Sequence, residues 1–211
     1  TIKNATSIRE ASDCVLTQYE RPANQGTSVQ EKRASYGQST YDKFAKKTTT
    51  QQPNQGGTNK MSNSSLVNCT VLSPNHSGKR THAIDRITPH CVVGQLSAEN
   101  IGGCFTSPSR QASCNYGIGP DGRVCLIVDE ANRSWCSSSS ANDQRAVTIE
   151  VASDMTEPYA FKDAAYNKLV DLCVDICKRN GKKKLIWIAD KEKALAYNPK
   201  SNEMLLTVHR W

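Results

Sequence analysis

Apolar and β-branched residues gather in short runs from about residue 84 to the end of the chain. These runs predict strands at 84–93, 112–118, 123–128, 146–152, 184–189 and 203–208. Asp121-Gly122, between the second and third runs, is typical of a hairpin turn. Between residues 161 and 179 the apolar positions follow helical spacing, which predicts one long helix. Strands separated by a helix, with one hairpin, predict an α/β fold with a central mixed β-sheet flanked by helices.

The predicted long helix carries one apolar stripe, and Gly181 follows its last turn as a typical helix-ending residue. The stripe consists of Ala165, Leu169, Leu172, Cys173, Ile176 and Cys177.

The first 45 residues have a different pattern, which predicts two short helices. Ser7-Ile8-Arg9-Glu10 and Ser28-Val29-Gln30-Glu31 are capping-box sequences, and each predicts a helix start. Residues 46–60 contain no large apolar side chain and predict a flexible linker. We therefore divide the chain into a helical segment, 1–45, a linker, 46–60, and a main domain, 61–211. The segment 1–45 is too short to stand alone, so it is the end of an upstream domain or docks on the main one.

Composition narrows the choice of partners. The net charge is +7, from 27 Lys and Arg against 20 Asp and Glu, which favours nucleic acid or the anionic envelope of a Gram-positive bacterium. The basic residues are scattered, and the main run, Lys182-Lys183-Lys184, follows a helix end where cations are favourable anyway. We therefore predict no nucleic-acid partner.

The number of cysteines and the hydropathy of the chain indicate the cellular compartment in which the protein is made. The nine cysteines are odd in number, and several lie inside apolar strand or helix patterns, which indicates a reduced protein made in the cytoplasm. The sequence has no signal peptide and no apolar run of membrane-spanning length, so we predict no membrane insertion.

One glycine motif is set aside. Residues 117–122 fit the G-x-G-x-x-G string of dinucleotide-binding proteins. The string falls between two predicted strands instead of between a strand and a helix, and Pro-Asp-Gly is turn chemistry. A hairpin is the better interpretation.

Two histidines mark the ends of apolar runs that are far apart in the sequence, His90 and His209. A histidine in such a place is more often a satisfied buried side chain than a ligand. Zinc, however, takes neutral imidazoles with a third ligand and an open position for water. Glu150 alternates with Val147, Ile149 and Val151, so it lies on the other face of its strand. It is either a solvated carboxylate or a base beside a metal.

Five motifs carry a resemblance to a known family. They are Ile87-Thr88-Pro89-His90, Ser113-Cys114-Asn115-Tyr116-Gly117-Ile118, Arg133-Ser134-Trp135-Cys136, Val147-Thr148-Ile149-Glu150 and Leu206-Thr207-Val208-His209-Arg210-Trp211. With them, the stretch from Ile84 to Trp211 resembles type-2 N-acetylmuramoyl-L-alanine amidases, the zinc family that includes peptidoglycan recognition proteins and many phage endolysins. It resembles above all the amidase domain of clostridial-type phage endolysins. Residues 1–45 resemble the end of a glycan-cleaving domain found upstream in some multidomain phage lysins.

The resemblance implies an activity and a site. His90 and His209 would be ligands of Zn2+, Glu150 the general base, and Trp135, Asn115 and Tyr116 the substrate-binding residues. The reaction would cleave the amide between N-acetylmuramic acid and L-alanine in bacterial peptidoglycan. The protein would be made in the cytoplasm of the bacterial host and act on the cell wall, as a monomer or as part of a larger lysin.

The chain also departs from the family pattern. The family's third zinc ligand, Asp or Cys, follows the second histidine, whereas this chain ends at Trp211, so we expect a domain truncated after His209. Cys91, His82, Cys114 and Cys136 are conceivable substitutes, although Cys91 would face away from His90. Two alternatives therefore stay open: a peptidoglycan-binding module without catalysis, and an inert fragment with a structural role in a larger lysin or phage particle.

Overall fold

The computed structural model describes residues 7–14, 26–45 and 63–208. The chain divides into two compact units, Thr1–Thr58 and Asn59–Trp211. Among the described residues, no helix is both long and apolar enough to cross a lipid bilayer.

The first unit contains the two predicted helices, α1 (Ile8–Cys14) and α2 (Thr27–Ala45). The Ser7 hydroxyl accepts a hydrogen bond from the backbone N–H of Glu10 at 3.1 Å, as the capping sequence predicts. Arg9 bridges the helices, since its guanidinium donates to Gln30 Oε1 at 3.1 Å. The second helix begins one residue before Ser28, and the carbonyl of Gly26 accepts from its first turn, so the cap predicted at Ser28 is wrong.

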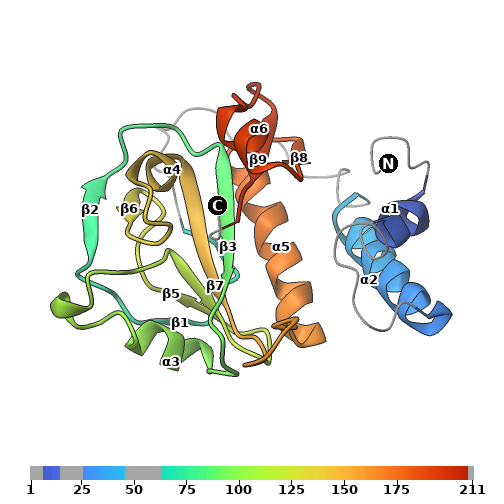
Figure 1. Cartoon of the computed structure of the whole chain (residues 1–211), viewed down its shortest axis with the longest axis horizontal. Coiled ribbons are helices and arrows are strands. Elements are labelled where there is room, and N and C mark those ends of the chain that lie inside the picture. Colours follow the sequence, from blue (N-terminus) through green and yellow to red (C-terminus); the bar gives the residue numbers. More distant parts are fainter. Residues whose placement is uncertain (1–6, 15–25, 46–62, 209–211) are drawn as a thin grey trace. The chain divides into compact units, whose positions relative to one another are not determined.

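The second unit is built on a seven-stranded mixed sheet, which confirms the predicted fold class (Figure 1). Every neighbouring pair is parallel except β4 and β5, which form the predicted hairpin around Gly122. Gly122 has a φ of 82°, a conformation that favours glycine in such a turn. The order across the sheet is β1 (Cys69–Thr70), β5 (Val124–Leu126), β4 (Tyr116–Ile118), β7 (Ala146–Val151), β3 (Arg86–Cys91), β9 (Glu203–Leu206) and β8 (Lys184–Trp187).

The long helix α5 (Asp163–Arg179) covers one face of the sheet (Figure 1). All six residues of its predicted stripe are buried, and they pack with Ile87, Val147 and Ile149 of the central strands. Gly181 follows the helix with a φ of 67°, as predicted. The opposite face packs against α3 (Ala98–Gly103), whose Ile101 lies in a second apolar cluster with Cys125 and Ile127.

Several short elements were not predicted, because each is too short for its apolar pattern to repeat. They are β1, α3, a two-stranded sheet of β2 (His76–Lys79) with β6 (Asn132–Ser134), one 3-10 turn at Pro108–Arg110, α4 (Ser140–Arg145) and α6 (Lys191–Ala196). Polar caps begin three of these helices: the side chains of Ser97, Ser139 and Asp190 each accept from a backbone N–H of the first turn.

Candidate active site

His90 and Glu150 stand opposite each other on adjacent strands. They are register partners of β3 and β7 in the parallel ladder. Because side chains alternate along a strand, both point to the face away from α5, while Ile87, Val147 and Ile149 fill the core on the other side. Sixty residues of sequence separate the pair, and the strand pairing brings them together.

The pair is in hydrogen-bond contact, with 3.0 Å between His90 Nδ1 and Glu150 Oε1. The side chain of Glu150 is 10% exposed and that of His90 is 34% exposed, so the site is open on the histidine side. With its proton on Nδ1, the ring donates to the carboxylate, and a metal held by this ring would bind through Nε2. The carboxylate thus orients the imidazole.

Cys136 completes the near surroundings of Glu150. Its thiol donates to Glu150 Oε1 across 3.9 Å. Burial, together with the negative charges of Glu150 and Asp143, raises the pKa of the Cys136 thiol well above its ordinary value. Asp143 also fixes this loop, since its carboxylate accepts hydrogen bonds from the backbone N–H groups of Cys136 and Ser137.

A buried polar network lies two residues before His90, and the sequence analysis missed it. The hydroxyls of Thr88 and Thr207 are 2.7 Å apart. Asn142 of α4 donates to Thr88 Oγ1 at 3.0 Å and accepts from Thr207 Oγ1 at 3.5 Å. The network therefore connects β3, α4 and the segment that follows β9. A sequence signal was present, because each candidate zinc histidine has a threonine two positions before it.

Trp135 lies on the partly exposed surface after β6. Its indole N–H donates to Ser77 Oγ at 2.7 Å, and its backbone N–H donates to Ser113 Oγ at 3.0 Å. An indole that is half-buried and anchored at one end leaves part of its ring for contact with a ligand.

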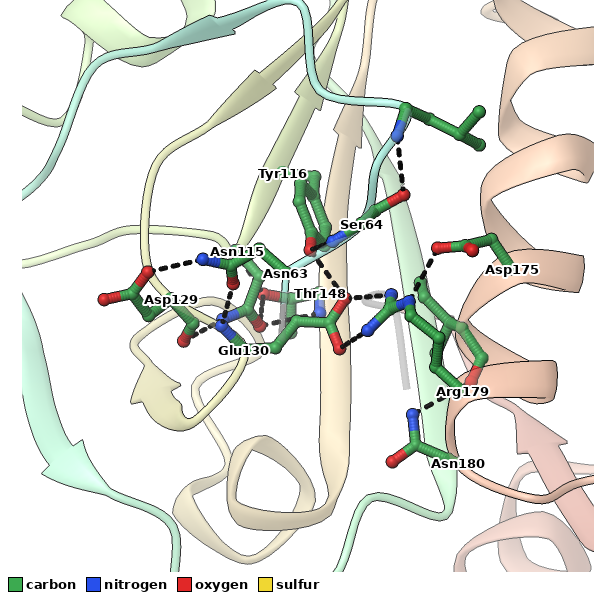
Figure 2. A network of polar contacts seen from close by, with 12 residues as sticks. Asn63, Ser64, Asn115, Tyr116, Asp129, Glu130, Thr148, Asp175, Arg179 and Asn180 are labelled. Atoms are coloured by element: carbon green, nitrogen blue, oxygen red, sulfur yellow. Dashed lines mark hydrogen bonds and ion pairs between the residues drawn. The ribbon is translucent and has the colours of Figure 1, made fainter. Parts of the chain in front are cut away.

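Asn115 and Tyr116 lie inside the domain, with no exposed surface. The Asn115 amide donates to the carbonyl of Val128 at 3.1 Å and accepts from the backbone N–H of Thr148 at 3.1 Å. The hydroxyl of Tyr116 donates to Glu130 at 2.6 Å (Figure 2). Burial and the charge of Glu130 raise the pKa of this phenol. These placements argue against the substrate-binding role that the resemblance implies, because both side chains are occupied in holding strands and loops together.

The remaining candidate ligands are scattered or outside the described residues. His209 lies outside them, so its role stays a prediction. His82 is exposed in the turn before β3, and Cys91 pairs with Val151, a residue on the α5 side of the sheet. Cys114 is fully buried, and burial raises the pKa of its thiol.

Zinc fits this site by the type of donor, since it takes neutral imidazole and carboxylate oxygen. Within residues 7–14, 26–45 and 63–208, however, no three His, Cys, Asp or Glu side chains are grouped as metal ligands. Of the two histidines predicted as zinc ligands, only His90 lies within the described part of the chain.

Comparisons with known proteins give the family. The family described as N-acetylmuramoyl-L-alanine amidase matches residues 80–193. No curated protein matches the sequence.

Three solved structures are among those similar to this chain. A selenomethionine AmpD derivative is 19% identical with a TM-score of 0.46, over 55% of this chain and 75% of that chain. The endolysin amidase LysCS from Clostridium intestinale is 13% identical with a TM-score of 0.44, over 68% of this chain and 82% of that chain. Drosophila peptidoglycan recognition protein SA is 18% identical with a TM-score of 0.40, over 50% of this chain and 69% of that chain. The family match covers more than half of the chain and includes both His90 and Glu150, and the protein therefore belongs to the N-acetylmuramoyl-L-alanine amidase family.

Proposed function

We propose that this chain is a zinc-dependent peptidoglycan amidase that cleaves the bond between N-acetylmuramic acid and L-alanine. The observation that carries the proposal is the contact between His90 and Glu150, 3.0 Å apart on adjacent strands within the matched family region. A partly exposed imidazole beside a buried carboxylate supplies one metal ligand and one proton acceptor in a single place.

Glu150 is the residue that moves the proton. Its Oε1 atom is engaged by His90 and Cys136, which hold the carboxylate in one orientation. In the proposed reaction the carboxylate accepts a proton from the attacking water and delivers it to the departing amine. Zinc, when bound, would lower the pKa of water toward neutrality and polarise the amide carbonyl.

His90 and His209 would hold the metal. The proposal for His209 is supported by Thr207, whose hydroxyl contacts that of Thr88 at 2.7 Å. Thr88 and Thr207 each stand two positions before one of the two histidines in the sequence. Trp135 would contact the substrate with the exposed part of its indole.

The setting we propose is a phage-type lysin. It would be made in the cytoplasm of the bacterial host and would act on the wall, where its net charge of +7 suits an anionic envelope. The segment 1–45 would be the end of an upstream glycan-cleaving domain, joined through the linker 46–60.

A second candidate is a peptidoglycan-binding module of the same family without catalysis. It is favoured by the ligand set of the described residues, in which no three His, Cys, Asp or Glu side chains are grouped as metal ligands. Both candidates would bind purified walls, and catalysis separates them.

The test measures zinc content, wall binding and amide cleavage on the same samples. The parent should bind about one zinc per chain, and its cleavage of purified walls should expose free α-amino groups of L-alanine. Glu150→Gln should keep zinc and wall binding and lose roughly 10²- to 10⁴-fold in rate, because the proton acceptor is gone. His90→Ala and His209→Ala should lose zinc. Glu192→Gln, which changes an exposed carboxylate of α6, is the matched control and should behave as the parent.

Each failure has its own meaning. Wall binding without cleavage in the parent would establish the binding module instead. Full cleavage by Glu150→Gln would remove Glu150 from the mechanism, and zinc retained by His90→Ala would remove the metal site.

A further inference from the structure

Two cysteines on neighbouring strands face each other at the edge of the sheet. Cys69 of β1 and Cys125 of β5 are register partners in a parallel ladder. Both lie in the apolar cluster that α3 covers, so their side chains are on the same face of the sheet. This place is separate from the candidate active site, which lies on β3 and β7.

The separation suits a disulfide. Neighbouring strands lie about 4.7–4.9 Å apart, within the roughly 4.4–6.8 Å range of Cα separations that disulfides span. Both residues carry free thiols, and both side chains belong to the same apolar cluster. Because β1 has two residues and one neighbour in the sheet, it can adjust by the small shift that a bond would need.

The two thiols differ in access. Cys69 is half-buried, and its thiol donates to the backbone carbonyl of Val124 across 3.8 Å. Cys125 has no exposed surface, and burial raises the pKa of its thiol to about 12. A soluble reagent therefore meets Cys69 first, and Cys125 can react only with a neighbour already in contact.

We propose that Cys69 and Cys125 form a redox-modifiable thiol pair that a small-molecule disulfide oxidises to an intramolecular disulfide. The thiolate of Cys69 attacks one sulfur of oxidised glutathione, and one glutathione thiolate leaves. Cys125 loses its proton as its sulfur attacks Cys69, and the second glutathione leaves as a thiolate. The protein loses two hydrogen atoms and two electrons, and one oxidised glutathione becomes two reduced ones.

The disulfide would stabilise the edge of the sheet. It would link the edge strand β1 covalently to β5 across a long stretch of sequence. Closing such a loop restricts the unfolded chain, so the oxidised form should unfold at a higher temperature than the reduced form. The thiols would remain free in a reducing cytoplasm and would react in an oxidising exterior.

The test treats the full chain with oxidised glutathione and maps its cysteines by proteolysis and mass spectrometry. The expected result is one linked peptide pair containing Cys69 and Cys125, which dithiothreitol releases, and a Tm that is several degrees higher. Cys69→Ser should abolish the linked pair. Cys104→Ser, which removes an exposed cysteine of the same domain, should retain it.

A glutathione adduct on Cys69 with no linked peptide would overturn the proposal, and so would linkage of Cys69 to Cys104. The peptide map of the parent protein decides between these outcomes even if a variant folds poorly.

Discussion

Arg179 should be the most costly single side chain to remove outside the apolar core, because it neutralises a buried carboxylate. At the end of α5, its guanidinium donates to Glu130 Oε2 at 2.9 Å and to Oε1 at 2.5 Å, and its Nε donates to Asp175 at 2.8 Å (Figure 2). The side chain of Glu130 is 1% exposed, against 21% for Arg179. The pair ties α5 to the loop after β5.

The loss of unfolding free energy in Arg179→Met follows from the buried carboxylate of Glu130, which would lose its ion-pair partner. Removing one partner of a buried ion pair costs about 3–5 kcal/mol, because the other charge stays buried without compensation. The hydroxyl of Tyr116 would still donate to Glu130, and the positive charge of Arg80 also acts on it. We therefore expect the lower end of the range, about 3 kcal/mol, or a Tm lowered by roughly 6–12 °C for a domain of this size.

The assay is urea unfolding followed by circular dichroism, with a matched control. Arg123→Met removes an arginine from an exposed pair with Glu99, whose side chains are 49% and 42% exposed, and should cost far less than Arg179→Met because water screens the exposed pair. Adding Glu130→Gln to Arg179→Met should recover part of the loss, because no buried charge would remain. If Arg179→Met costs no more than Arg123→Met, the reasoning from burial is wrong.

Two further predictions concern the candidate site and the core. Thr207→Val removes the hydroxyl that contacts Thr88 and Asn142, and should weaken zinc binding roughly 10- to 100-fold in a chelator competition. The exposed Thr81→Val is its control, and equal zinc affinity in both would contradict the positioning role. Burial raises the pKa of Cys173 from 9.0 to about 12, so its neutral thiol contributes stability that is complete below pH 9 and declines as the pH rises toward 12. Cys173→Ala should therefore flatten the alkaline fall of the unfolding free energy, measured under reducing conditions, and an unchanged slope would refute this.

The sequence by itself determined the elements whose signal is local and long enough to repeat. The α5 stripe ends in Cys173, Ile176 and Cys177, and every member is buried as predicted, because helical spacing places them on one side. The hairpin at Asp121-Gly122 and the central strands also follow from local pattern. From the sequence, His90 and Glu150 were predicted to be the zinc ligand and the general base of one candidate active site.

The tertiary structure decided which of these elements meet. The contact of His90 with Glu150 and the pairing of Cys69 with Cys125 depend on strand order, which alternation within one strand does not encode. Tyr116 shows the same limit, because its motif suggested a groove whereas packing turned its hydroxyl toward Glu130. Short helices such as α4 depend on single caps and on neighbours such as Thr88. The physical reason is that periodicity is set by adjacent side chains, whereas the choice of neighbours is set by burial summed over the whole domain.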